Sequence, residues 1–127
     1  MSFTVIQPGV LSLLQDSGRY GYSNTGLTTG GPADGWSFRW ANYLLQNQHS
    51  ATAIEISVGG LHLQADTDSY FCVCGATMPL TINGHAKPLW TVHKVQAGDH
   101  IVLGMATSGL RAYLAVAGGF SIAPQFG

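Results

Sequence analysis

Short runs of β-forming residues, separated by turn residues, recur along the chain and constrain its fold more than any other feature. Runs of this kind between Gly, Pro, Asn, Asp and Ser clusters are typical of short strands. Because many short strands would leave exposed edges, we expect a mainly β fold whose antiparallel strands close into a barrel. The predicted strands are 3–6, 10–14, 53–57, 61–65, 69–74, 79–82, 86–89, 93–95, 100–103 and 111–116.

Turn residues divide the second half of the chain. Asn83-Gly84 is the strongest signal, because both residues tolerate the positive φ angles of a type I′ hairpin turn. Residues 97–99 and 107–109 also have turn compositions, and we interpret them as further hairpin turns. The second half is therefore predicted to be an antiparallel meander.

Residues 34–46 have the periodicity of a helix instead. Asp34 is a candidate N-cap, and apolar side chains follow it at helical spacing. We expect this segment to be the one substantial helix of the fold, buried on more than one side, where it would plug a barrel mouth or face a partner. Its two apolar faces would contain Trp36, Trp40, Tyr43 and Leu44, and Phe38, Ala41 and Leu45.

The composition restricts the partners and the location. The chain has 127 residues, which fit one domain, and 46% of them are hydrophobic. Only 9% are Asp, Glu, Lys or Arg, against about 25% in typical soluble domains, so part of the surface is expected to be an interface. The formal net charge of -1 and the scattered Lys and Arg argue against a nucleic-acid partner. Without a signal-peptide pattern or an apolar run of ~20 residues, we expect no membrane association and a cytoplasmic location.

Polar residues that can bind a small ligand concentrate between residues 15 and 34. Asp16, Arg19 and Asp34 lie there among many glycines, although the whole chain has only 5 Lys or Arg and 6 Asp or Glu residues. A guanidinium in a glycine-flanked turn can present two donors to a carboxylate or phosphate. Arg19 is therefore either an anion anchor or the salt-bridge partner of Asp16 or Asp34.

Asp34 and Glu55 each have two interpretations. The Asp34 carboxylate can bind a ligand or cap the predicted helix, and its position favours the cap. Glu55 is the only glutamate in the chain and lies inside an apolar strand. If Glu55 faces the core, it must be paired or protonated, as functional carboxylates often are. If it faces solvent, it is one surface charge.

Motifs for metals, nucleophiles and phosphate loops are missing from the sequence. The five histidines match no zinc-binding spacing, so no metal site is predicted. Cys72 and Cys74 are two residues apart on a predicted strand, which suits small core residues better than a disulfide or a metal pair. The sequence has no G-x-S-x-G elbow and no Walker-type loop, so triad chemistry and Walker-type nucleotide binding have no support.

Two sequence blocks resemble one protein family. The first is Gln15-Asp16-x-Gly18-Arg19, and the second is Arg-Ala-Tyr-Leu-Ala-Val-Ala-Gly-Gly at residues 111–119. With the glycines between them, these blocks are similar to the allophanate hydrolase subunit 2 family, also called the biotin-dependent carboxyltransferase or 5-oxoprolinase C-subunit family. The resemblance runs from about residue 3 to the last residue. It implies a cyclophilin-like closed β-barrel.

The resemblance also implies chemistry on an amide or ureido group. The leading interpretation is a subunit of an ATP-dependent amidohydrolase of the 5-oxoprolinase type, which acts on a small cyclic amide or ureido substrate. ATP would be used through the complex with a sister subunit of related barrel fold, of the type of allophanate hydrolase subunit 1 or the 5-oxoprolinase B-subunit. Two alternatives stay open. One is the carboxyltransferase part of a biotin-dependent urea carboxylase, which uses carboxybiotin, and the other is a non-catalytic module that docks on a sister subunit.

Roles for the polar residues follow from the same resemblance. In carboxyl transfer, Asp16 or Glu55 would be the base that removes a proton from the acceptor nitrogen, which makes them the expected catalytic residues. In 5-oxoproline opening, Arg19 would bind the substrate carboxylate, and backbone amides between Gly18 and Gly31 would stabilise developing charge. The run at 30–33 departs from the family's Ser-Gly-Ala-Met, so the identity of the substrate stays open. The expected substrate-binding residues are Arg19, Gly18, Gly30, Gly31 and Asp34.

The family's members are longer than this chain. Residues 1–127 are therefore expected to form a single cyclophilin-like domain that is the N-terminal part of a longer architecture. We expect the isolated chain to be inactive.

Overall fold

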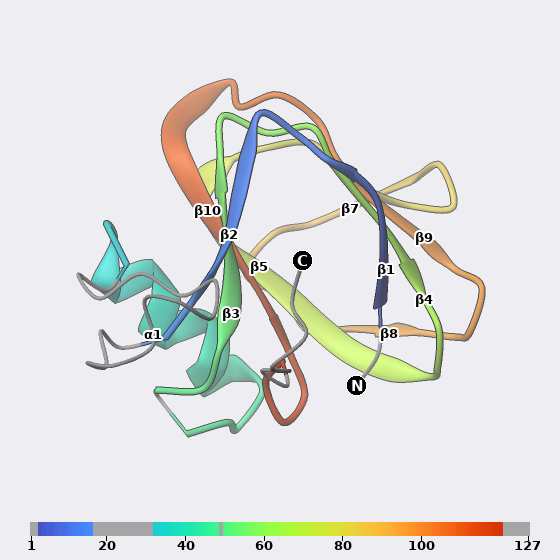
Figure 1. Ribbon diagram of the computed structural model, residues 1–127, viewed down its shortest axis with the longest axis horizontal. Helices are drawn as coiled ribbons and strands as arrows, with labels where there is room; N and C mark the ends of the chain where they lie inside the picture. The colour runs from blue at the N-terminus through green and yellow to red at the C-terminus, as the bar shows by residue number, and fades with distance from the viewer. Residues whose placement is uncertain (1–2, 17–31, 49, 121–127) are drawn as a thin grey trace.

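Two five-stranded antiparallel sheets and one short helix make up the described part of the chain (Figure 1). The computed structural model describes residues 3–16, 32–48 and 50–120. The mainly β fold is thus confirmed, and the closure of the strands into one barrel stays a prediction. The first sheet contains, in spatial order, β1 (Phe3–Pro8), β4 (Leu61–Ala65), β9 (His100–Leu103), β6 (Leu80–Ile82) and β7 (His85–Lys87). The second sheet contains β2 (Leu11–Gln15), β3 (Ala53–Ser57), β10 (Ser108–Val116), β5 (Ser69–Thr77) and β8 (His93–Val95).

Each predicted strand corresponds to a strand of the structure. The largest differences are at the end of β5, which continues to Thr77, and at the start of β10, which begins at Ser108. The predicted hairpin between β6 and β7 is confirmed, because Asn83 and Gly84 have φ angles of 51° and 81° and the two strands pair.

The predicted meander of the second half is wrong. β8 pairs with β5 in the second sheet, whereas β9 pairs with β4 and β6 in the first. The turn at residues 97–99 therefore carries the chain from one sheet to the other, and the connection at 104–107 carries it back. Turn residues predict where a chain reverses, but which strand it joins depends on burial at a distance. Crossing between the sheets lets β9 add Ile101 and Leu103 to the core that both sheets share.

The main hydrophobic core lies between the two sheets. Leu63 and Leu103 of the first sheet and Ile56 and Leu114 of the second are buried in it. β4 and β9 alternate buried and half-buried residues, so one face of the first sheet is partly open to solvent. In contrast, all residues of β3 are buried, so the second sheet is covered on both faces along this strand.

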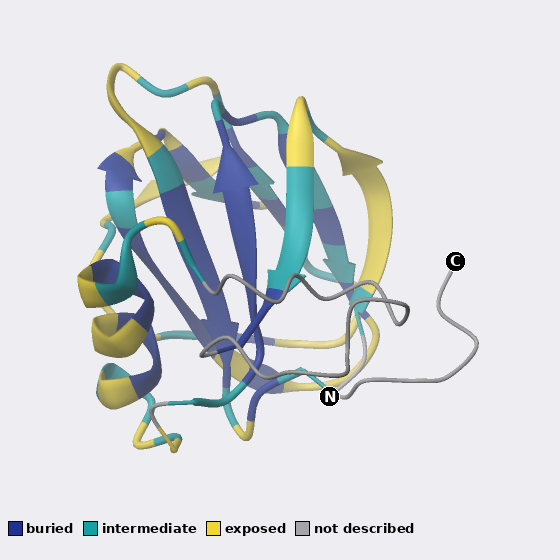
Figure 2. Cartoon of the chain, turned by 60° about the vertical axis from the view of Figure 1, so that its left-hand side comes forward, coloured by how far each residue is buried: buried dark blue, intermediate teal, exposed yellow. Residues whose placement is uncertain are grey.

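The helix α1 (Gly35–Leu44) covers the outer face of the second sheet (Figures 1 and 2). Phe38 and Ala41 pack there against Cys72, Cys74 and Tyr113. The helix and its N-cap at Asp34 are confirmed, and the helix is somewhat shorter than the predicted 34–46. The aromatic rings of the first predicted face point away from the sheet instead. Exposed fractions of 59% at Trp36 and 67% at Tyr43 show that the chain itself buries only one side of the helix, so burial on more than one side is wrong within the chain. That the exposed side faces a partner stays a prediction.

The two cysteines are core residues, as predicted. Cys72 and Cys74 are free thiols that are fully buried beneath α1, and the Cys72 thiol donates a hydrogen bond to the carbonyl of Ala41 at 3.1 Å. The hydrogen bond with Cys72 and burial together raise the pKa of the Cys74 thiol. Cys74 therefore stays protonated. Both cysteines act as small apolar side chains.

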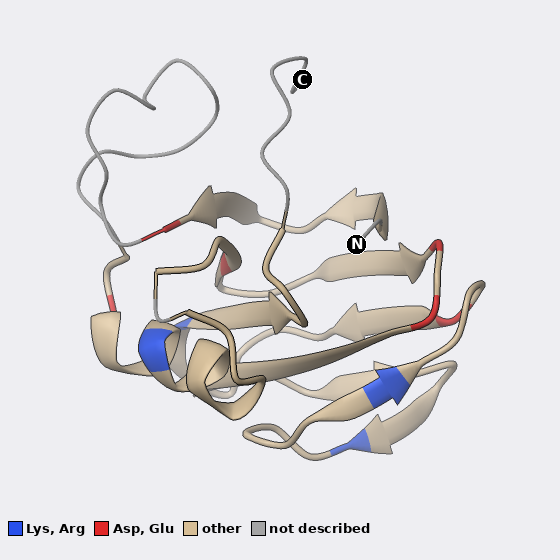
Figure 3. Ribbon diagram, turned by 90° about the horizontal axis from the view of Figure 1, so that it is seen from below, with Lys and Arg blue, Asp and Glu red and all other residues tan. Residues whose placement is uncertain are grey.

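Charged residues are sparse on the described part of the chain, and Lys and Arg are spread over the helix and several strands (Figure 3). Within the described ranges, no helix is long and apolar enough to cross a membrane. The same residues contain no group of three or more His, Cys, Asp or Glu side chains placed to hold a metal ion.

Candidate functional site

Glu55 lies in the core and is hydrogen-bonded on both carboxylate oxygens. Its side chain is 5% exposed. The hydroxyl of Tyr113 donates to its Oε2 at 2.5 Å, and the backbone N–H of Ala33 donates to the same oxygen at 2.9 Å. The side-chain amide of Gln15 donates to Oε1 at 3.3 Å. Of the two interpretations of Glu55, the structure selects the buried and paired carboxylate.

The pairing of β3 with β10 brings Glu55 and Tyr113 together. The two residues are directly opposite in the register of the strands, so their side chains emerge on the same face of the second sheet. The Tyr113 hydroxyl also accepts the backbone N–H of Asp34 at 2.8 Å. Burial, and then the hydrogen bond with Glu55, raise the pKa of Tyr113 above its ordinary value. Tyr113 therefore remains a neutral donor to Glu55 across the physiological pH range.

Glu55 consequently binds the chain on both sides of residues 17–31. Gln15 precedes that segment and Ala33 follows it, and both donate to the one carboxylate. This arrangement makes Glu55 a residue that fixes the backbone leading into α1. A buried carboxylate with these donors is well satisfied, since each of its oxygens accepts at least one hydrogen bond.

Asp34 is the N-cap of α1. Its Oδ1 accepts the backbone N–H of Ser37 at 3.1 Å, and its Oδ2 accepts the Ser37 hydroxyl at 2.5 Å. The backbone N–H of Asp34 is itself held by Tyr113. The cap interpretation is thus confirmed, and the carboxylate also lines the cavity described next.

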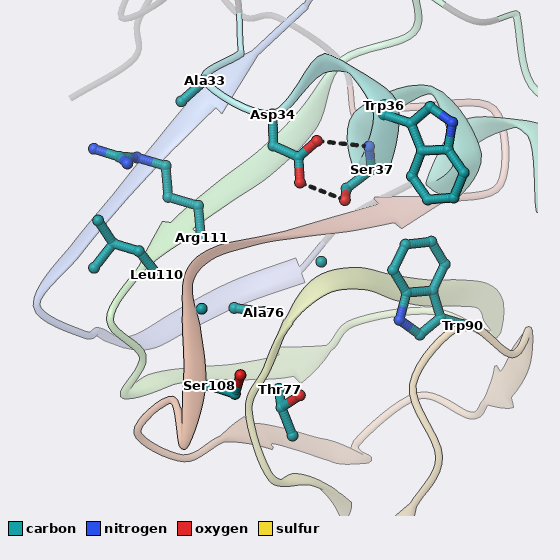
Figure 4. Close-up of a pocket in the computed structure, with 12 residues that line it drawn as sticks. Ala33, Asp34, Trp36, Ser37, Ala76, Thr77, Trp90, Ser108, Leu110 and Arg111 are labelled. Carbon is teal, nitrogen blue, oxygen red and sulfur yellow. Dashed lines mark hydrogen bonds between the residues drawn. The ribbon is translucent and has the colours of Figure 1, made fainter.

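A cavity of about 440 Å³ opens beside the start of α1 (Figure 4). Its volume lies within the range of small-molecule sites, roughly 300–1,000 Å³. The lining combines hydroxyl groups, a carboxylate, a guanidinium and two indole rings. The lining residues come from within residues 33–37, 75–77 and 108–111, together with Trp90.

An irregularity in β10 shapes the floor of this cavity. The register between β10 and β5 shifts between Ser108 and Ala112, so residues 109–111 face a shorter stretch of β5, as in a β-bulge. At Gly75, with φ of +119°, an added Cβ would lie 2.6 Å from the carbonyl oxygen of Arg111. The close approach of the two strands therefore requires glycine at this position.

The two ends of the cavity differ in chemistry. Arg111 and Leu110 lie at one end, and the indole rings of Trp36 and Trp90 lie at the other (Figure 4). The ring centroids of the two tryptophans are 5.8 Å apart. Trp90 has a φ of 59°, which is an uncommon backbone conformation for a bulky residue. Its backbone N–H donates to the carbonyl of Val73 at 2.7 Å.

The described residues that are expected at one site do not line one cavity. Asp16 is buried and lines a different cavity, of about 680 Å³, together with Asn47, Thr52 and neighbouring residues. Asp34 lines the cavity beside α1, whereas Glu55 lines neither of the two. Four further candidates, Arg19, Gly18, Gly30 and Gly31, lie outside the described residues.

Sequence reasoning overlooked three residues at or behind this cavity, namely Tyr113, Arg111 and Trp90. Arg111 and Tyr113 belong to the block at 111–119 that carried the family resemblance, but they were given no role. Strand alternation contained a usable signal, because Arg111 and Tyr113 are two residues apart and near Glu55 in the sheet. No local pattern marked Trp90.

Comparison with known proteins identifies the family of the chain. The model of the "Carboxyltransferase domain, subdomain A and B" family matches residues 25–127. The chain belongs to this carboxyltransferase domain family. The resemblance to a biotin-dependent carboxyltransferase family is thereby confirmed.

The chain is similar to segments of several longer proteins. The chain is 34% identical to the C-subunit of 5-oxoprolinase from Escherichia coli over 125 residues, which cover 97% of the chain and 40% of that protein. It is 34% identical to the urea amidolyase of Lachancea kluyveri over 129 residues, which cover 99% of the chain and 7% of that protein. The crystal structure of Kluyveromyces lactis urea carboxylase matches with a TM-score of 0.84 and 36% identity, covering 92% of the chain and 10% of that structure. The chain therefore spans less than half of each of these relatives.

Proposed function

We propose that this chain is a component of an ATP-dependent 5-oxoprolinase-type complex and that the cavity beside α1 holds the small cyclic amide substrate. The observation that carries the proposal is the cavity itself. The cavity combines a guanidinium, the carboxylate that caps α1 and aromatic walls. The chain that forms it is 34% identical to the C-subunit of a 5-oxoprolinase. Opening an amide ring requires an anchor for the substrate and donors for developing negative charge, and residues of this cavity offer both.

The expected catalytic carboxylates have different roles in this proposal. Asp16 lines a separate cavity and so has no part in the cavity beside α1; its role as a base in the carboxyl-transfer alternative stays a prediction. Glu55 accepts donors from Gln15, Ala33 and Tyr113. These hydrogen bonds favour a positioning role for Glu55, in which it holds the backbone at the cavity wall. The assignments of Arg19, Gly18, Gly30 and Gly31 as substrate-binding residues stay predictions.

A second candidate is carboxyl transfer. The matching family model describes a carboxyltransferase domain, and a matching structure is a urea carboxylase. In that case the cavity would receive a ureido acceptor, and carboxybiotin would supply the carboxyl group. A sister subunit of related fold is part of both proposals. The cyclophilin-like barrel and a cytoplasmic location likewise stay proposals.

Reconstitution separates these candidates. The chain is combined with candidate sister subunits encoded next to its gene, and ATP hydrolysis is measured with and without 5-oxoproline. We expect ATP turnover that depends on 5-oxoproline. Biotin-dependent carboxylation of urea without that turnover would support carboxyl transfer instead, and stable pairing with neither activity would support the non-catalytic module.

A further inference from the structure

Arg111 is the cationic residue in the described lining of the cavity beside α1. We propose that Arg111 binds the carboxylate of the substrate, so that this cavity selects a small cyclic amide acid over a neutral ureido compound. The proposal rests on the proposed function, because it takes this cavity as the substrate site. It assigns the anion anchor to a residue of β10 that the sequence did not single out.

The guanidinium of Arg111 has no polar partner among the described residues. The residue itself is half-buried. Arginine stays protonated in proteins and offers a planar fork of donors that matches a carboxylate. A part-buried cation beside a cavity is better stabilised by an anionic ligand than by bulk water alone, because the surroundings are less polar than water.

Local geometry holds Arg111 at the cavity. The irregular register of β10 begins after Ser108 and ends at Ala112, so Arg111 lies at its end. The carbonyl of Arg111 faces Gly75, where any Cβ would come within 2.6 Å of it. A strand of regular register would place this side chain differently relative to β5. The bulge thus directs the guanidinium to one end of the cavity (Figure 4).

The remaining lining suits a ring that carries both an acid and an N–H group. Asp34 is placed on the same cavity, and each of its oxygens accepts one hydrogen bond from Ser37. A carboxylate oxygen has room for a second donor, so Asp34 can still accept a ring N–H. The indole rings of Trp36 and Trp90 form the apolar end of the same cavity, away from Arg111. Urea has N–H groups but neither an acid group nor ring carbons.

Ligand titrations of the full chain test this assignment. The ligands are 5-oxoproline and 2-pyrrolidinone, which has the same ring without the carboxylate, and binding is followed by tryptophan fluorescence and calorimetry. We expect 5-oxoproline to bind at least about tenfold more tightly than 2-pyrrolidinone, because a charge-assisted hydrogen bond contributes about that factor to the affinity. Arg111→Met should abolish that preference, and Arg111→Lys should restore part of it. Arg39→Met is the matched control, because Arg39 is an exposed arginine of α1 outside this lining.

Several results would overturn the assignment. Equal affinities of the unmodified chain for the two ligands, binding of neither, or an unchanged preference in a folded Arg111→Met variant would each do so. Circular dichroism and a thermal melt establish that the variant is folded. If the assembled complex hydrolyses ATP with 5-oxoproline and Arg111→Met leaves kcat/KM unchanged, the anchor is wrong while the proposed function stands. If no such turnover exists but the acid still binds through Arg111, the proposed function is wrong while the anchor stands.

Discussion

The outer faces of the two sheets differ, although both sheets share one core. In the first sheet, β4 and β9 alternate buried and half-buried residues, and polar side chains such as His62 and His100 meet at 2.8 Å on its half-buried face. In the second sheet, α1 covers the outer face and every residue of β3 is buried. A polar group on a solvated face can exchange its partner for water, but one under a helix cannot. The second sheet therefore carries the fully partnered Glu55 and the first does not.

Removing the buried acceptor should have the largest effect. We expect Glu55→Ala to lower the free energy of unfolding by about 3 kcal/mol, because it leaves donors from Gln15, Ala33 and Tyr113 without their acceptor. Gln64→Ala, on half-buried β4 of the first sheet, is the matched control and should cost less than about 1 kcal/mol. Urea denaturation measures both. Equal losses in the free energy of unfolding would show that a polar residue needs its partner no more on the covered face than on the open face.

Removing a single hydroxyl from the same network should cost less. Tyr113→Phe keeps the ring against Phe38 but leaves the N–H of Asp34 without its acceptor, so we expect a loss of about 1.5 kcal/mol near neutral pH.

The same variant should alter the response to alkali. Because the pKa of Tyr113 is raised in the folded state, the unfolded chain loses this proton first as the pH rises above about 10. The contribution of this group is complete below pH ~10 and is lost above it, and Tyr113→Phe should reduce that alkaline loss. The control is Tyr43→Phe, at an exposed position, which should leave the alkaline loss as it is. An identical alkaline loss in Tyr113→Phe and the unmodified chain would contradict the inferred burial effect.

The helix cap should contribute about 1 kcal/mol. Asp34→Ala removes the acceptor of the Ser37 N–H, whereas Asp34→Asn keeps a capping oxygen and should be nearly neutral for stability. Hydrogen exchange in the first turn of α1 reports the effect locally. If both variants destabilise the chain equally, the charge rather than the cap is what matters at this position.

The smallest effect is expected on the open face. His62→Ala removes the hydrogen bond to His100 on the first sheet, and we expect a loss of about 0.5 kcal/mol or less, because water can replace the partner. Urea denaturation gives the value. A loss as large as that of Glu55→Ala would remove the distinction between the two faces.

Sequence reasoning was most successful where a signal is local. The strand positions, the Asn83-Gly84 hairpin and the Asp34 cap were all predicted, because turn geometry and capping depend on residues a few positions apart. The candidate site residues stay predictions. Asp34 lines the cavity beside α1 and Asp16 lines another, and no local pattern relates Arg111 to either, because the cavity is formed by segments far apart in the chain.

The sequence by itself determined where the strands lie, where the chain turns and where the helix begins. Only the tertiary structure decided that β9 joins the first sheet, that Glu55 is buried against Tyr113, and that the bulge of β10 opens a cavity. The physical reason is distance along the chain. Glu55 and Tyr113 are 58 residues apart, so their contact depends on strand register and on burial under α1 rather than on neighbouring residues.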